Sequence, residues 1–301
     1  MSRAELAQAL CMCLFQDLIE RVPVASAYVN DARAAGTLID LDHGALRTVK
    51  WPSGDLPPGE ASLTRVLRAL GYQHNGTYPL EKLRMTGRSW CHQDIPEGIA
   101  QFFVSELHPE RFSLAFQSAV DRVIGNSTDP LNAGHTALLE TLSRDRSISK
   151  KEALLLFPAL ISCFGRQHSL FEISDYDTLA AESAEMAWIA TEGNVFNHAT
   201  DRVVDVHAVA EQQRKLGRPI KQAVEISASG NVRQTAFQAA EVHRRFLQNG
   251  KTVTRAVPGS FYELISRDVV RAEGTPERLD LQFDAGNATG IFAMTSARVP
   301  A

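Results

Sequence analysis

The spacing of apolar residues predicts a helix over residues 3–21 and a second helix that ends at Gly71. Between these helices, the stretch LIDLDHGALRTV (38–49) alternates apolar and polar residues, which is typical of a strand, and it carries His43. Three further runs are strand-like, near residues 72–80, 86–92 and 99–106. The predicted order in this part of the chain is therefore strand, helix, strand, strand, strand.

Helical spacing of apolar residues dominates the middle of the chain, roughly residues 109–191. Four segments show it: SLAFQSAVDRVI, AGHTALLETLSR, SKKEALLLFPALISCF and TLAAESAEMAWIATE. We therefore expect a helical insert here.

After residue 192 the predicted order of strand, helix and further strands is repeated. The run NVFNHAT (194–200) is short, apolar and strand-like, and it contains His198. A helix is predicted from Asp205, a suitable N-cap, to Gly217. Strand-like pieces follow in RPIKQAVEIS, NVRQTAFQAAEV and GSFYELISRD, and ATGIFAMTSAR is a candidate for one more.

The combined pattern predicts an α+β fold with two βαβββ units and a helical insert between them. The expected parts are an N-terminal helix with the first unit (1–108), the insert (109–191) and the second unit (192–301), integrated into one domain. The two units share a pattern but hardly any sequence. Each has a histidine on its first strand, and a sheet built from both units would bring these two strands near a shared centre.

Composition narrows the classes of partner. The 301 residues are 44% hydrophobic, which is enough for a substantial core, and the net charge of −4 without a basic stripe argues against nucleic acid or an anionic membrane as partner. The N-terminal apolar run is short and no long apolar stretch follows, so we expect neither a signal peptide nor a membrane span. The cysteines show no metal or disulfide spacing, so we expect reduced thiols and a cytoplasmic protein; they are Cys11, Cys13, Cys91 and Cys163.

Two histidines and one glutamate form a candidate metal site. A divalent metal that reacts with substrate and oxygen often has two imidazole ligands and one carboxylate ligand, with open positions beside them. His43 and His198 supply the imidazoles. Glu263 lies among apolar residues in SFYELISRD, and a buried carboxylate is costly unless it is paired or bound to metal. Glu263 is therefore the expected third ligand.

Several motifs resemble known families. FYELISRD is similar to the ligand strand of 4-hydroxyphenylpyruvate dioxygenase. More closely, DHGALRTV, SELHPERFSLAFQ, FNHATDRVVDV and VRQTAFQAA resemble the 2-oxoadipate dioxygenase/decarboxylase family, also called hydroxyglutarate synthase. The resemblance touches both units and implies the vicinal-oxygen-chelate fold, in which paired βαβββ units form a central curved sheet. It also implies a shortened member, because characterised members are longer.

The same resemblance implies Fe(II) bound by His43, His198 and Glu263. It implies O2 and a 2-oxo dicarboxylic acid as the small-molecule partners, with 2-oxoadipate converted to 2-hydroxyglutarate and CO2 in lysine catabolism. Arg47 matches an arginine that binds a substrate carboxylate in that family. Arg47 has the same strand parity as His43, so both side chains face one side of the sheet, and the spacing permits a metal ligand and a carboxylate contact in one pocket. Gln234 in VRQTAF is a candidate to hydrogen-bond the substrate or a metal ligand. Arg233 has the opposite strand parity, so only one of the two should face the pocket, and we prefer Gln234.

Two other functions fit the same residues. One is a metal-dependent isomerase or lyase on this fold, in which Glu263 or a nearby group moves protons. The other is a binding module that has lost catalysis, against which the intact His, His, Glu pattern argues. O2 consumption with CO2 release separates the dioxygenase from both. Among the remaining histidines we expect structural roles, with His92 the most tempting exception, and the pattern carries no information on oligomeric state.

Overall fold

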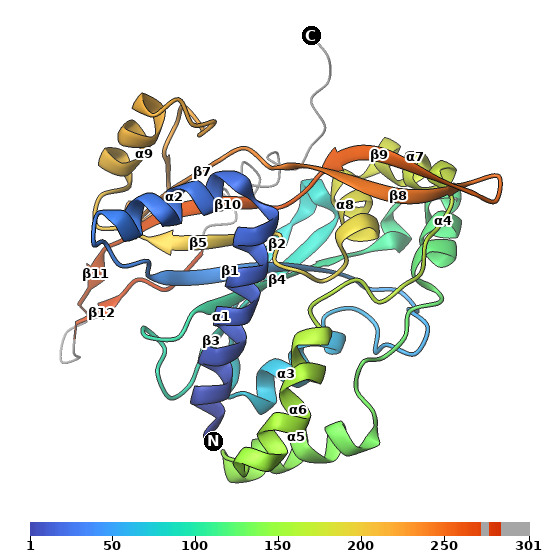
Figure 1. Ribbon diagram of the computed structural model, residues 1–301, viewed down its shortest axis with the longest axis horizontal. Coiled ribbons are helices and arrows are strands. Elements are labelled where there is room, and N and C mark those ends of the chain that lie inside the picture. Colours follow the sequence, from blue (N-terminus) through green and yellow to red (C-terminus); the bar gives the residue numbers. More distant parts are fainter. Residues whose placement is uncertain (272–276, 284–301) are drawn as a thin grey trace.

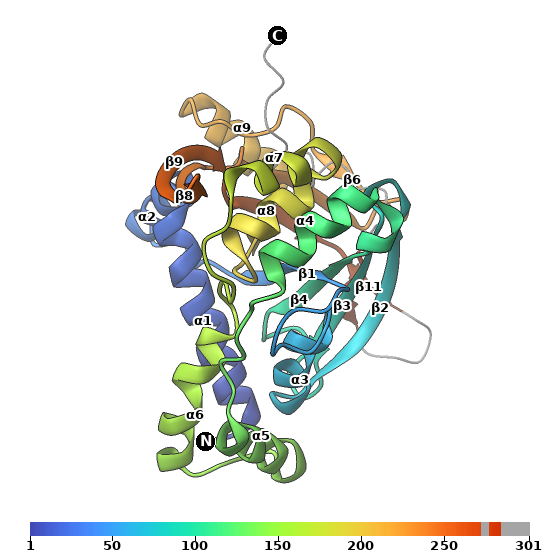
Figure 2. The same cartoon turned by 90° about the vertical axis from the view of Figure 1, so that its right-hand side faces the viewer.

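Within the residues that the structure describes, 1–271 and 277–283, a curled eight-stranded mixed sheet organises this computed structural model (Figure 1, Figure 2). The strand order across the sheet is β2-β3-β4-β1-β5-β10-β7-β6. In chain order these strands are β1 (Leu41–Val49), β2 (Tyr72–Leu80), β3 (Met85–His92), β4 (Gln101–Leu107), β5 (His198–Arg202), β6 (Glu225–Ile226), β7 (Val232–Ala236) and β10 (Phe261–Arg267). With helices on the sheet, the fold is α+β, as predicted.

The first strands of the two predicted units pair directly at the centre of the sheet. β1 is antiparallel to β5, while β4 runs parallel to β1 and β10 runs parallel to β5. The sequence order is β1, α3, β2, β3, β4 in one half and β5, α9, β6, β7, β10 in the other half. The predicted juxtaposition of the two first strands is therefore confirmed.

The helices begin and end at clear local signals. Ser2 and Glu5 form a capping box at the start of α1, and the Asp205 side chain accepts hydrogen bonds from the backbone N–H groups at the start of α9, as predicted. The helices are α1 (Arg3–Arg21), α2 (Pro23–Ala34), α3 (Ala61–Ala69), α4 (Leu114–Ile124), α5 (Ala133–Asp145), α6 (Lys150–Ser162), α7 (Ile173–Glu182), α8 (Ala184–Glu192) and α9 (Val206–Lys215), with 3₁₀ turns η1 (Glu81–Leu83) and η2 (Pro109–Arg111). In the part of the chain described, none of these helices has the length and apolar character to cross a bilayer.

One face of the sheet packs against helices. Leu46, Phe102 and Leu264 point to this face and join the core formed with α1, α2 and α3. Figure 1 shows α1 and α2 lying across the sheet. The helices between β4 and β5 lie in two places (Figure 2): α4, α7 and α8 pack together, whereas α5 and α6 pack against α3 and α1. The opposite face, which carries His43, packs at one end against α4, α7 and α8 through Val49 and Leu107.

The structure differs from the predicted pattern in the second half. The strand-like run over 231–242 contains β7, as predicted, but β7 ends at Ala236, and a separate hairpin of β8 (Glu241–Gln248) and β9 (Lys251–Pro258) follows. Its turn, Asn249-Gly250, has positive φ angles of 51° and 73°, which is the signal for such hairpins. Helix α2 and the short pair β11 (Val269–Val270) and β12 (Arg278–Leu279) were not predicted either. The candidate strand in ATGIFAMTSAR lies outside the described residues.

Candidate metal centre

Three adjacent strands at the centre of the sheet bring the predicted ligands to one face. His43 of β1 and Glu263 of β10 are both register partners of Thr200 in β5. His198 lies two residues before Thr200 on the same strand, so its side chain points to the same side. The sheet therefore collects both histidines and the glutamate from segments far apart in the sequence.

A glycine allows the segment before β5 to approach β1 closely. A Cβ atom on Gly44 would lie 2.1 Å from the ring of Phe196, so no other residue leaves room for this ring. The backbone N–H of Asn197 also donates to the carbonyl oxygen of Ala45 at 2.8 Å. The glycine in DHGALR thus helps to set His198 beside β1.

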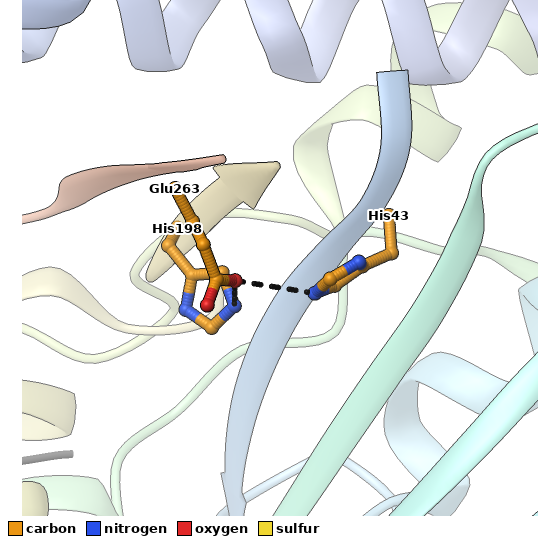
Figure 3. Close-up of side chains that lie close together, drawn as sticks. All are labelled: His43, His198 and Glu263. Atoms are coloured by element: carbon orange, nitrogen blue, oxygen red, sulfur yellow. Dashed lines mark ion pairs between the residues drawn. The ribbon is translucent and has the colours of Figure 1, made fainter. Parts of the chain in front are cut away.

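The three side chains converge in the way a metal site requires (Figure 3). One ligand atom from each of His43, His198 and Glu263 lies within 4.8 Å of the others, and all three residues are buried. The Glu263 Oε2 atom is 3.5 Å from His43 Nε2 and 3.3 Å from His198 Nε2. Among the described residues, Glu263 Oε1 has no hydrogen-bond partner although it is shielded from water. This donor set with an orphaned carboxylate oxygen fits a divalent metal ion.

The protonation states also suit a metal. Burial lowers the pKa of His198 to about 3, helped by the charges of His43 and Arg47 and opposed by Glu263. Burial alone would raise the pKa of Glu263, but the hydrogen bond from His43 and the charge of His198 lower it below its ordinary value. Glu263 is therefore a carboxylate and His198 a neutral imidazole, the forms that bind metal ions. Burial alone would lower the pKa of His43, but its hydrogen bonds to Asp42 and Glu263 raise it, so a metal ion at its Nε2 atom would displace a proton.

The buried ion pair between Asp42 and Arg267 orients the His43 ring. Asp42 Oδ1 lies 2.7 Å from His43 Nδ1, and Asp42 also accepts two hydrogen bonds of 2.9 Å from the Arg267 guanidinium. Burial opposes the charge of Asp42, but Arg267 and His43 hold the pKa of this carboxyl well below its usual range. When Nδ1–H donates to Asp42, the lone pair of His43 Nε2 is available for a metal.

Asp42→Asn is expected to weaken metal binding about 10- to 100-fold, the usual effect of changing a group that orients a metal ligand. The amide can still contact His43 but cannot balance the buried Arg267 charge. A titration with Co(II) measures the change. The matched control is Asp268→Asn, which affects a more exposed ion pair with Arg233 on the other side of the sheet; unchanged Co(II) affinity in Asp42→Asn would remove Asp42 from the site.

The face of the sheet that carries His43, His198 and Glu263 is called the ligand face below. The two predicted substrate residues both lie on it. Arg47 is only 1% exposed, and its guanidinium carbon is 5.1 Å from the centre of the Trp188 ring. Gln234 is the register partner of Ile265, which points to the same side as Glu263, whereas Arg233 pairs with Asp268 on the other side. The preference for Gln234 over Arg233 thus agrees with the sheet geometry.

Comparison with known families assigns the chain. The sequence profile of the family described as 2-oxoadipate dioxygenase/decarboxylase matches residues 12–293. The chain belongs to the 2-oxoadipate dioxygenase/decarboxylase family. A curated relative in this family, the chloroplastic 2-oxoadipate dioxygenase/decarboxylase of Arabidopsis thaliana, is 23% identical over 216 residues, which are 65% of this chain and 51% of the relative. The chain thus spans about half the length of the curated relative it matches.

Solved structures agree with this family fold. A protein of the glyoxalase superfamily from Ralstonia eutropha JMP134 is 57% identical, with a TM-score of 0.90 over 95% of this chain and 88% of that chain. Hydroxyglutarate synthase from Oryza sativa in complex with 2-oxoadipate is 20% identical, with a TM-score of 0.75 over 98% of this chain and 93% of that chain. The corresponding Pseudomonas putida complex is 17% identical, with a TM-score of 0.69 over 100% and 75%. The fold is therefore of the vicinal-oxygen-chelate type, as the motifs implied.

Sequence reasoning missed the residues that support the ligands. Thr200 donates to Glu263 Oε2 at 2.8 Å and lies 3.1 Å from His43 Nε2. Thr200 lies two residues after His198 on the same strand, so its side chain points to the same side of the sheet. This spacing is the sequence signal for its role. The contact of Asp42 with the His43 ring could not be predicted from the sequence. The pairing of β1 with β5 is irregular between Leu41 and His43, so simple alternation of side chains does not apply there.

Proposed function

We propose that this chain is a non-haem Fe(II)-dependent dioxygenase that oxidatively decarboxylates and hydroxylates a 2-oxo dicarboxylic acid. The proposed reaction converts 2-oxoadipate and O2 to 2-hydroxyglutarate and CO2. The observation that carries the proposal is the buried set of His43, His198 and Glu263 in a member of this family. Two histidines and one carboxylate are the ligands of many ferrous oxygenases, and they leave positions open. When bound here, Fe(II) would supply the redox chemistry with O2.

The solved relatives support the class of substrate. The rice and Pseudomonas putida hydroxyglutarate synthases are described in complex with 2-oxoadipate. Such a molecule has two carboxylates, one beside the 2-oxo group and one at the far end. On the ligand face of this chain, a metal held by the three ligands would bind the carboxylate beside the 2-oxo group. The buried guanidinium of Arg47 would bind the carboxylate at the far end. Arginine suits this role because its planar fork donates two parallel hydrogen bonds to a carboxylate.

The protein's own part in the reaction is to position the substrate and to exclude water. The His198 ring lies 4.7 Å from the ring of Phe261, and the His43 ring lies 4.8 Å from that of Phe283. These aromatic walls keep water from the reacting atoms and so strengthen the electrostatic contacts inside the site. In this proposal Gln234 adds a hydrogen bond to the substrate from β7.

Oxygen uptake by the anaerobically Fe(II)-loaded chain tests the proposal. We expect one O2 consumed per 2-oxoadipate added, with 2-hydroxyglutarate identified by mass and CO2 released. The control is the same protein loaded with Zn(II), which binds similar ligands but has no redox chemistry. Iron bound at one per chain without O2 uptake would contradict the dioxygenase and favour the isomerase or lyase on the same fold.

A further inference from the structure

Gln101, the first residue of β4, occupies the place beside His43 on the ligand face of the sheet. The two residues are partners in the parallel pairing of β1 and β4, which lie side by side in Figure 1. Partners on adjacent strands point to the same side of a sheet. Gln101 is 1% exposed, so its amide lies in the same buried layer as the candidate metal ligands.

A neighbouring thiol orients this amide. Cys91 of β3 donates a hydrogen bond of 2.8 Å from its Sγ atom to Gln101 Oε1. Burial raises the pKa of the Cys91 thiol to about 12, so at neutral pH the sulfur keeps the proton that it donates. The carbonyl oxygen of Gln101 is thus occupied, and its NH₂ group is left to donate elsewhere.

The Gln101 NH₂ group has no acceptor in the described part of the chain, residues 1–271 and 277–283. A buried donor without a partner costs about 1–3 kcal/mol, and native proteins keep few such groups. A ligand whose oxygens reach this part of the ligand face would remove the cost. The orphaned Oε1 of Glu263 lies three strands away in the same cross-strand row, beyond His43 and Thr200.

We propose that Gln101 donates a hydrogen bond to the metal-binding end of the substrate, namely the 1-carboxylate of a 2-oxo acid. This inference rests on the proposed function. A 2-oxo dicarboxylate carries only acceptor oxygens at neutral pH, so the protein must recognise it with donors. Arg47 lies four residues along β1 from His43, about 13 Å at 3.3 Å per residue, and serves the far carboxylate. Gln101 serves the near one, because its register partner is His43 itself.

Ligand titrations of the Co(II)-loaded chain, followed by the visible spectrum of the metal, test this assignment without turnover. The probes are 2-oxoadipate and oxalate, which has the metal-binding end but no distant carboxylate. Gln101→Met keeps the size of the side chain and is expected to weaken both ligands roughly tenfold or more. Arg47→Met is expected to weaken 2-oxoadipate alone. The matched control Gln73→Met changes an exposed glutamine on β2 and should change neither affinity.

A pair of variants at Cys91 tests the orientation of the amide separately. Cys91→Ala removes the donor to Gln101 and is expected to weaken oxalate about two- to tenfold, the effect of one neutral hydrogen bond. Cys91→Ser keeps a donor and should restore most of the affinity. Equal oxalate affinity in Cys91→Ala and the wild type would contradict the proposed orientation, and this pair decides the matter if Gln101→Met does not fold.

The outcomes separate this inference from the proposed function. A folded Gln101→Met chain that binds Co(II) and keeps wild-type affinity for oxalate would overturn the role of Gln101. A wild-type chain that binds oxalate but not 2-oxoadipate would remove the proposed substrate, while the oxalate affinities would still decide on Gln101. A wild-type chain that takes up no Co(II) would overturn both.

Discussion

His198→Ala is expected to abolish stoichiometric metal binding and, with it, O2 uptake. Changing a group that only orients a ligand costs about 10- to 100-fold in metal affinity, so removing one of three direct ligands should cost at least about 1,000-fold. The site cannot replace the imidazole, because His198 is buried on a central strand with β1 and β10 on either side. Metal content after dialysis against a weak chelator measures the loss directly.

The control for this variant is a buried histidine that lies outside the triad. The Nε2 atom of His168 lies 2.8 Å from the carbonyl oxygen of Ala190, and glutamine can make a similar contact. His168→Gln should therefore keep one metal ion per chain. Thermal melting of both variants shows whether they fold. A folded His198→Ala chain with full metal content and full activity would prove the assigned site wrong.

The central part of the fold could be predicted because local patterns and function agree there. The alternation in β1 gives the direction of His43 and Arg47, and the repeated strand order brings β1 and β5 together. The third ligand followed from the cost of a carboxylate in an apolar strand, which does not depend on knowing the fold. Only the structure shows that Glu263 reaches both histidines, through pairing with β5.

The supporting residues depend on cross-strand register, which sequence patterns do not specify. Gln101 opens a strand whose start was predicted two residues too early, and its contact with Cys91 joins β3 to β4. Arg267 reaches Asp42 from a strand that does not pair with β1. The hairpin of β8 and β9 has a turn signal in Asn249-Gly250, which the predicted strand-like runs on either side of it did not include.

Arg47→Met is expected to raise the KM for 2-oxoadipate roughly 100-fold or more, because truncating one partner of a buried charge pair costs several kcal/mol. Burial lowers the pKa of Arg47 to about 10, against the charge of Glu185, so the guanidinium remains protonated at neutral pH. Metal content should not change, since Arg47 is not among the converging ligands. Steady-state O2 uptake over a range of substrate concentrations gives the KM.

Arg47→Lys separates charge from geometry. Lysine keeps the positive charge but cannot donate the two parallel hydrogen bonds of the fork, so we expect a KM between those of the wild type and Arg47→Met. With 2-oxohexanoate, which lacks the distant carboxylate, the three proteins should differ little. Arg233→Lys changes an arginine on the opposite side of the sheet and serves as the control. Equal KM values for 2-oxoadipate in the wild type and Arg47→Met would place Arg47 outside the substrate pocket, because a group that binds the far carboxylate cannot be removed without cost.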